Sequence, residues 1–162
     1  MSRAVSNTSP LIVLAKAGLL ELLPKLFSEV AVPEAVRDEI MAGGDDDAMK
    51  RALPNRVWLR AVVLAPPLSP LAAMQLGRGE AEAIEYARRQ TDCAILLDDR
   101  AGRRTAQALG LRLFGTLSVV AAASRQGYIS SFEEALQRLR NAGLYVSEAV
   151  VDAVRRGLLD TR

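Results

Sequence analysis

Short apolar runs alternate with longer amphipathic segments along most of the chain. The runs are rich in Val, Leu and Ala and are bounded by Gly, Pro, Asn or Asp, which predicts strands around Val5 and over residues 28–32, 56–65, 93–97 and 111–115. Apolar positions in the other segments recur at helical spacing and predict helices over residues 8–17, 19–27, 33–44, 48–53, 77–90, 100–110, 116–127, 130–143 and 147–159. Strands and helices in alternation indicate an α/β fold with a mostly parallel sheet covered on both faces.

Residues at the helix ends support this assignment. Thr8 or Ser9 is expected to be the N-cap of the first helix, Ser131 has the spacing of a capping box, and Ser147 suits the N-cap of the last helix. The chain shows no repeats, low-complexity tracts or internal linker. We therefore expect residues 1–162 to form one domain that ends in helices from about residue 131.

The carboxyl ends of the strands are where a functional site is expected, because ligands bind outside this edge in open α/β sheets. Separate segments place oxygen-bearing side chains near that edge: Asn7 directly after the first strand, then Glu39, Glu80, Glu82, Asp98 and Asp99. Hard divalent cations such as Mg²⁺ and Mn²⁺ take oxygen ligands of this kind. The sequence therefore predicts a metal site at this edge.

Each acidic residue also has an ordinary structural interpretation. Carboxylates in the first turn of a helix interact favourably with the helix dipole, which fits Glu80, and Glu39 suits a solvated helix face. The acidic run at residues 45–47 suits a solvated loop. The metal hypothesis therefore depends on the joint arrangement of these residues.

The composition narrows the chemistry that such a site can perform. The chain has no histidine and a single cysteine, Cys93, which enters an apolar run and is expected to be buried. A disulfide framework, Cys/His zinc sites and any mechanism that needs an imidazole base are thereby excluded. A carboxylate-bound metal is the main hydrolytic chemistry left open.

Arginine residues flank the acidic segments, although the net charge of the chain is only +2. Arg78 precedes Glu80, and Arg100, Arg103 and Arg104 follow the Asp98-Asp99 doublet. Arginine forks suit phosphate, so these residues, together with Ser9 in the first corner, are candidate substrate contacts. The alternative is a solvated helix face with ordinary ion pairs.

Other classes of protein are disfavoured by what the sequence lacks. No apolar stretch approaches the about 20 residues that a membrane span needs, and no secretion signal is apparent, so we expect a cytoplasmic protein. No Gly-rich phosphate loop follows the first strand, which argues against a nucleotide-binding Rossmann protein.

Several stretches occur in the order typical of one known family: "VSNTSPLIVLAKAGLLELL", "EVAVPEAVRDEI", "GRGEAEAIEYA", "LLDDRAGRRTAQALGLRLFGTLSVV" and "LRNAGLYVSEAVVDAV". Together they resemble the PIN-domain-like family catalogued as domain of unknown function 3368, which is related to VapC-type toxins. The similarity covers nearly the whole chain.

The resemblance implies a Rossmann-like α/β/α sandwich with a metal-dependent ribonuclease site. It places the metal ligands at Asn7, Glu39, Glu80 and Asp99, and it assigns catalysis to the three acidic members of this set, Glu39, Glu80 and Asp99. Asp98 and Glu82 are secondary candidates for the metal. Asn7 departs from the usual acidic residue at its position. An amide oxygen can still bind a hard cation but adds no negative charge, so the site is expected to be weakened. Alternatively, Asn7 has only the structural role of holding the turn at Thr8.

These observations lead to two hypotheses about function. The first is an endoribonuclease dependent on Mg²⁺ or Mn²⁺, the toxin of a prokaryotic toxin–antitoxin pair. Its expected partners are RNA, a small antitoxin and further copies of itself as a homodimer or higher homo-oligomer, because its Ala- and Val-rich helices permit close packing. The second is a PIN-fold protein with a weakened pocket that binds protein or RNA without cutting it.

Overall fold

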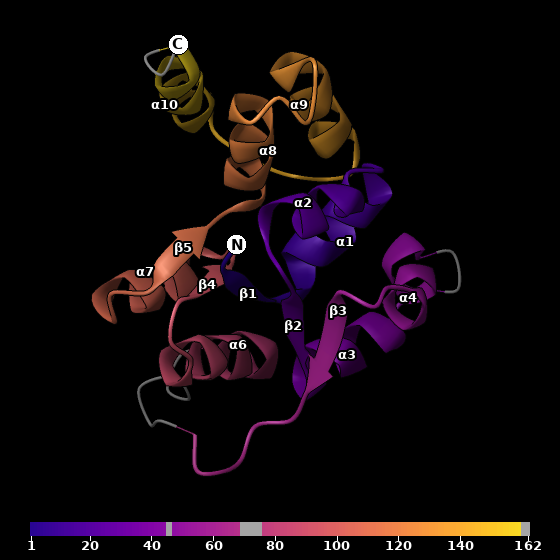
Figure 1. Ribbon diagram of the computed structural model, residues 1–162, viewed down its shortest axis with the longest axis vertical. Helices are drawn as coiled ribbons and strands as arrows, with labels where there is room; N and C mark the ends of the chain where they lie inside the picture. Colours follow the sequence, from indigo (N-terminus) through magenta and orange to yellow (C-terminus); the bar gives the residue numbers. More distant parts are fainter. Residues whose placement is uncertain (45–46, 69–75, 160–162) are drawn as a thin grey trace.

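A sheet of parallel strands forms the centre of the protein (Figure 1). The computed structural model describes residues 1–44, 47–68 and 76–159, so most of the acidic run at 45–47 and the end of the Pro-rich loop at 66–70 lie outside the described residues. The described strands are β1 (Arg3–Ser6), β2 (Val30–Pro33), β3 (Leu59–Val62), β4 (Cys93–Leu96) and β5 (Arg112–Phe114). They pair in the order β3-β2-β1-β4-β5, and every pair is parallel. The predicted α/β architecture is therefore confirmed, and the sheet is parallel in all its described pairs.

Alternation along the strands divides the core into two apolar clusters, one on each face of the sheet. Ala4 pairs in register with Val30 and Ala94, and all three belong to one cluster. Val5 pairs with Ala31 and Ile95, which belong to the other. Both faces are buried, as expected when helices cover a parallel sheet on each side.

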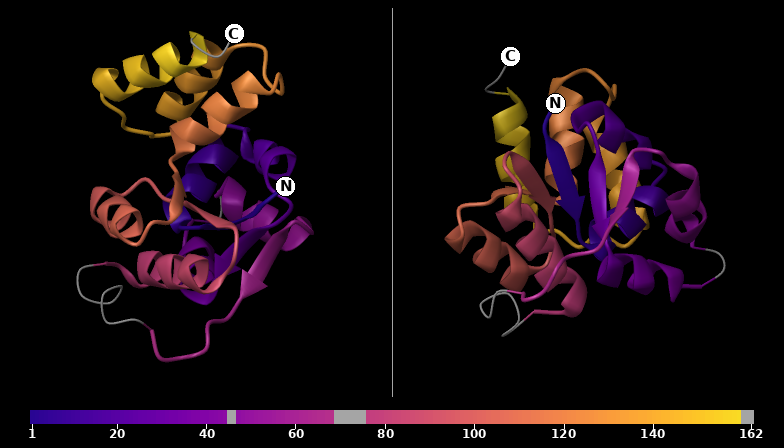
Figure 2. Two further views of the ribbon diagram at one scale, coloured as in Figure 1. Left: turned by 60° about the vertical axis from the view of Figure 1, so that its left-hand side comes forward. Right: turned by 60° about the horizontal axis from the view of Figure 1, so that its bottom comes forward.

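The helices form the two outer layers (Figures 1 and 2). Helices α6 (Arg78–Arg89) and α7 (Arg100–Ala108) pack on the face that carries Val5. The opposite face is covered by α1 (Thr8–Lys16), the 3₁₀ helix η1 (Leu20–Leu22), α2 (Leu23–Leu26), α3 (Glu34–Met41), α4 (Ala48–Ala52), α8 (Thr116–Arg125), α9 (Phe132–Asn141) and α10 (Glu148–Leu159). A second 3₁₀ helix, η2 (Leu53–Asn55), follows α4.

Strand β3 is shorter than the predicted strand over residues 56–65. It lies at the edge of the sheet and pairs with β2 alone. Val57 and Val63, which flank it, are fully and about four-fifths exposed, at 102% and 79%. The apolar run that predicted a long strand therefore extends past the sheet into solvent at both ends.

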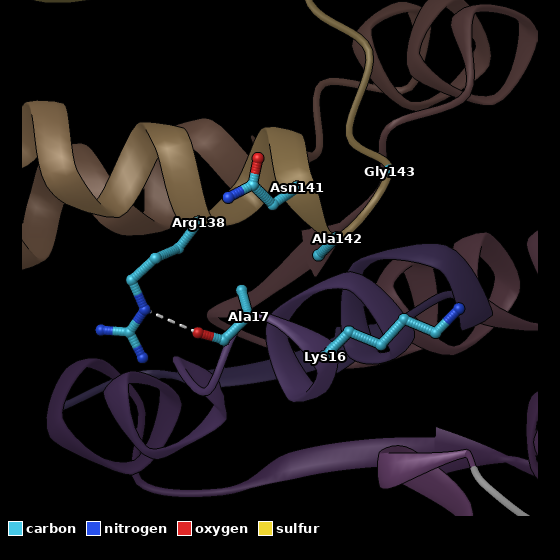
Figure 3. A pocket seen from close by; sticks show the side chains of 6 residues that line it. All are labelled: Lys16, Ala17, Arg138, Asn141, Ala142 and Gly143. Atoms are coloured by element: carbon cyan, nitrogen blue, oxygen red, sulfur yellow. Dashed lines mark hydrogen bonds between the residues drawn. The ribbon is translucent and has the colours of Figure 1, made fainter.

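Arg138 fastens the C-terminal helices to the end of α1 (Figure 3). Its guanidinium donates from Nε to the Ala17 carbonyl at 2.8 Å and from Nη2 to the Gly18 carbonyl at 3.0 Å. These carbonyls have no further turn of helix to bond to, because Gly18 turns the chain with a φ of 68°. An arginine from α9 thus supplies the missing donors, beside a hollow of about 510 Å³ that Lys16 and Asn141 also line.

The serine caps predicted for the last two helices are present. The Ser131 hydroxyl accepts a hydrogen bond from the Glu134 backbone N–H at the start of α9, and the Ser147 hydroxyl accepts one from Val150 at the start of α10. The Ala- and Val-rich sequence of helix α8 suggested self-association. Its apolar residues Val119, Val120 and Ala123 are buried within this chain.

Candidate functional site

The candidate site lies where the strand order reverses. The chain runs outward from β1 to β2 and β3, then returns to place β4 on the other side of β1. The connecting helices of the two halves lie on opposite faces, so the carboxyl ends of β1 and β4 form the switch point of the sheet, the place where open α/β proteins bind ligands, and we call this place the crevice. Asn7 follows β1 and donates its backbone N–H to the Leu96 carbonyl of β4 at 3.0 Å, which places it next to Asp98 and Asp99.

Asn7 is the N-cap of α1 by backbone conformation, which corrects the predicted Thr8 or Ser9. Its side chain makes no capping hydrogen bond and, within the described part of the chain, no other hydrogen bond. Yet the residue is only 7% exposed. A buried amide without a hydrogen-bond partner among the described residues favours a ligand-binding role for Asn7 over the structural role of holding the turn.

Gly79, in the first turn of α6, brings Asn7 and Glu39 together. A Cβ on Gly79 would lie 2.8 Å from Glu39 Oε1, and 3.2 Å from both Asn7 Oδ1 and Val36 Cγ2. The Thr8 hydroxyl donates to Glu39 Oε2 and so helps to orient this carboxylate. Two predicted ligands from different segments therefore turn oxygens toward one point, and the glycine leaves room for them.

Glu80 follows Gly79 and belongs electrostatically to the same group. Burial raises the pKa of its carboxyl, and the negative charges of Asp99 and Glu39 raise this pKa further, against a hydrogen bond from the Gly77 backbone that lowers it. Like charges have this effect only when they lie close together. Asp99 and Glu39 thus add to the negative charge around Glu80, although no three acidic side chains in the described ranges are grouped closely enough to hold a metal ion.

The two aspartates after β4 have different partners. Asp99 is exposed and is the N-cap of α7, where its Oδ2 accepts from the Gly102 N–H at 2.9 Å. Both oxygens of Asp98 accept hydrogen bonds from Thr116, from its N–H at 2.8 Å and from its hydroxyl. Asp98 therefore holds the start of α8, and Asp99 keeps an oxygen available at the crevice.

Glu82 likewise has structural partners. Its Oε2 accepts from the Ala35 N–H at 2.8 Å, at the start of α3, and its Oε1 lies 3.5 Å from Arg78 Nε. The residue is only 8% exposed. Of the predicted acidic residues, Glu82 and Asp98 thus cap neighbouring helices, whereas Glu80 is influenced by the charges of Asp99 and Glu39.

The predicted substrate contacts differ in how they are held. Arg78 is also 3.9 Å from Glu34, and Arg103 donates to the Leu97 carbonyl at 3.0 Å. Arg100 and Arg104 are exposed and form no ion pair with any residue that the structure describes. Ser9 is exposed on the first turn of α1.

The family model for the domain of unknown function 3368, described as a PIN domain, matches residues 3–159. The chain belongs to the PIN-domain family. A comparison with curated proteins gives no match. The PIN domain is a nuclease fold, its members are generally hydrolases of this class, and PIN nucleases bind RNA. The site geometry in this PIN domain can therefore be judged against nuclease chemistry.

The residues of this PIN domain suit a divalent cation in donor chemistry. PIN domains typically use divalent metals. The crevice offers an amide oxygen from Asn7 and carboxylates from Glu39, Glu80 and Asp99, the oxygen set that Mg²⁺ and Mn²⁺ prefer. Among the described residues, no three acidic side chains already converge at ligand distance on one point. The repulsion that raises the pKa of Glu80 is the kind of unfavourable charge that a bound cation would relieve.

Sequence reasoning missed Gly79. Its signal was available, because glycine within a helix costs about 0.5–1 kcal/mol relative to alanine and so calls for a packing reason.

None of the helices in the described ranges is long and apolar enough to cross a membrane.

Proposed function

We propose that this PIN-domain protein is an endoribonuclease that depends on Mg²⁺ or Mn²⁺. The observation that carries the proposal is the approach of Asn7 Oδ1 and Glu39 Oε1 to the side of Gly79 where a Cβ would lie, beside a Glu80 whose pKa is raised by burial and by Asp99. The four candidate ligands come from four segments of the chain: after β1, within α3, at the start of α6 and after β4. The paired oxygens of Asn7 and Glu39 suit a hard cation, which would in turn suit a phosphate.

Each residue has a distinct task in this mechanism. Glu39, Glu80 and Asp99 would hold the cation, with Asn7 as a neutral fourth ligand. When bound, the metal supplies positive charge to polarise the phosphodiester and to activate water. Thr8 orients Glu39, and Gly102 orients Asp99, so both carboxylates are fixed before substrate arrives. Arg100 and Arg104 would position the RNA backbone.

Cleavage of an RNA pool by the purified protein in Mn²⁺, in Mg²⁺ and in chelator tests the proposal. Asp99→Asn removes a charge but keeps a good N-cap for α7, so the fold should survive. Asp92→Asn is the matched control. Asp92 lies just before the amino end of β4, whereas Asp99 lies beyond its carboxyl end, so the same substitution is made on the other side of the strand. Metal-dependent cutting that falls at least a hundredfold in Asp99→Asn alone, as is typical when an electrostatic catalytic group is lost, supports the nuclease.

A binding module that does not cut RNA is the second candidate, and the uncharged Asn7 is the observation that favours it. In that case wild type and Asp99→Asn would both leave the RNA pool intact in every metal, while binding to RNA or to another protein would persist. Equal cutting by both proteins would indicate a contaminant and would also count against the nuclease.

The nuclease would act as the toxin of a toxin–antitoxin pair. The acidic crevice would be complementary to a basic segment of a small antitoxin, which could enter it in place of the metal. Expression in growing cells should arrest growth with wild type and not with Asp99→Asn. Co-expression of a small protein encoded by the neighbouring gene should relieve the arrest. Arrest that is equal in both variants would contradict this role.

A further inference from the structure

A groove of about 410 Å³ lies between α7 and the C-terminal segment. Arg100, Arg103 and Arg104 line it on the α7 side, and Tyr145, Val150 and Val154 line it on the other. Helices α7 and α10 lie on the same side of the molecule in each view of Figure 2. Asp98 also lines the groove, so one end of it reaches the residue before Asp99 at the candidate active site.

The α7 wall of the groove is cationic. Arg100 and Arg104 are exposed and form no ion pair within the described ranges, whereas most other arginines in those ranges have a carboxylate partner. Arg103 is fixed at the base: it donates to the Leu97 carbonyl, and its Nη1 lies 2.8 Å from where a Cβ on Gly115 would be. The one acidic side chain in this lining, Asp98, has both oxygens bonded to Thr116. The wall therefore presents positive charge that the protein itself does not neutralise.

The opposite wall presents an aromatic side chain to solvent. Tyr145 is 93% exposed, in a chain with only 4% aromatic residues, and Val150 beside it in the groove is 49% exposed. The segment that carries Tyr145 is anchored on both sides. Arg140 pairs with Glu148 at 2.6 Å, and Val151 is buried in the core. The ring is thus held outward on a fixed support and does not pack into the molecule.

We propose that this groove binds the single-stranded RNA that flanks the cleavage position, with phosphates on Arg100 and Arg104 and a base stacked on Tyr145. Unpaired arginines opposite an exposed aromatic ring are what sequence-tolerant binding of single strands requires, because every base has a face that can stack. The lining of the groove includes Asp98, the residue before Asp99, so RNA bound there would be continuous with RNA at the candidate site. The inference rests on the proposed nuclease function for its substrate, and it assigns Tyr145 as a positioning residue.

Binding of a short, unstructured, fluorescently labelled oligoribonucleotide, measured by anisotropy in chelator, tests the groove without any cleavage. Tyr145→Ala should weaken binding about five- to one-hundred-fold, the range expected for one stacked base, and Tyr145→Phe should retain it. Arg100→Ala and Arg104→Ala should each weaken binding and reduce its salt dependence. Tyr128→Ala is the matched control, since Tyr128 is exposed but lies over Lys25, outside this groove.

Unchanged binding by Tyr145→Ala would overturn the inference, and so would equal affinity for a double-stranded RNA whose bases cannot stack on the ring. The first result is also what a protein-docking groove would give. Failure of the nuclease proposal is distinguishable, because it shows as absence of cleavage in metal while Tyr145-dependent binding in chelator persists. Cleavage with Tyr145-independent binding would remove the groove assignment alone.

Discussion

At the scale of single residues, the tight packing over Gly79 links local backbone to the chemistry of the crevice. A Cβ on this residue would lie 2.8 Å from Glu39 Oε1 and 3.2 Å from both Asn7 Oδ1 and Val36 Cγ2. A methyl group added here would press on three side chains, those of Glu39, Asn7 and Val36, and on no backbone atom among its nearest neighbours. The site geometry is therefore more sensitive to this position than the fold is.

We expect Gly79→Ala to reduce metal-dependent cleavage at least tenfold while changing the free energy of unfolding by only about 1 kcal/mol, because alanine regains helix propensity. Chemical denaturation and cleavage assays on the same preparation measure the two effects. Gly157→Ala is the control, since a Cβ there meets nothing within 4 Å. Full activity in Gly79→Ala would show that the two oxygens need not converge.

Glu80 makes a pH-dependent contribution to stability in the absence of metal. Its pKa is raised in the folded protein by burial and by Asp99, so the folded state holds the proton to higher pH than the unfolded chain does. Folding is consequently favoured below the unfolded pKa of about 4.3, and that advantage is lost as pH rises through the raised value. We expect Glu80→Gln to be more stable than wild type at pH 7 in chelator, with the difference disappearing as pH falls toward 4.

Urea unfolding midpoints at several pH values measure this difference. Glu134→Gln, exposed in the first turn of α9, is a suitable comparison and should show no such gain at pH 7. A Glu80→Gln variant less stable than wild type at neutral pH would contradict this prediction. It would mean that favourable contacts of the Glu80 carboxylate outweigh its burial and its repulsion by Asp99 and Glu39.

At the scale of elements, several helix ends are completed by side chains from neighbouring segments. Glu82 of α6 accepts from the first turn of α3, Asp98 after β4 accepts from the first turn of α8, and Arg138 of α9 donates to the last carbonyls of α1. Each contact ties two elements that are distant in the chain. Hydrogen bonds to charged groups contribute about 1.5–3 kcal/mol each.

We expect Arg138→Ala to lower the free energy of unfolding by about 1–3 kcal/mol, because the Ala17 and Gly18 carbonyls lose their donors. Arg125→Ala, at the exposed end of α8, should change it by no more than about 0.5 kcal/mol. Urea denaturation of the three proteins provides the comparison. Equal losses in both variants would mean that α9 is held by its apolar face alone.

These inter-element contacts explain which parts of the molecule the sequence could predict. The strands and helices followed from local periodicity, and the carboxylate positions followed from their places after strands. The different roles of Asp98 and Asp99 could not be predicted from local sequence, because Asp98 is bonded to Thr116, which lies far along the chain. The length of β3 was overestimated because exposed Val57 and Val63 look like strand interior in sequence. The importance of Gly79 could not be predicted either, because it depends on where the side chains of Asn7 and Glu39, from other segments, are placed.

At the scale of the whole molecule, a ligand that binds only the native state stabilises every part of it. The stabilisation reaches about 2.7 kcal/mol when free ligand is a hundred times its dissociation constant. In a metal-binding PIN domain, the residues of the crevice would thus set the melting temperature of the entire chain. Asn7 is the position at which this coupling is most easily changed.

We expect Asn7→Asp to melt below wild type in chelator, because it adds a buried carboxylate beside Glu39, and to gain more from saturating Mn²⁺ than wild type does. Metal affinity should rise several-fold. Thermal melts in Mn²⁺ and in chelator measure the increment, with Asp99→Asn expected to show the smallest. Identical increments in all three proteins would place the metal elsewhere.

The central position of β1 has a consequence for the moment at which the protein is made. β1 leaves the ribosome before the other strands, yet Arg3 pairs with Cys93 of β4, and Asp99 follows that strand. At about 5–20 residues per second, several seconds of synthesis pass before the second edge of β1 finds its partner. During that time the growing polypeptide has three of the four candidate ligands and no crevice. If the protein cleaves RNA as proposed, this order of assembly would keep the unfinished protein harmless to the transcript from which it is being translated.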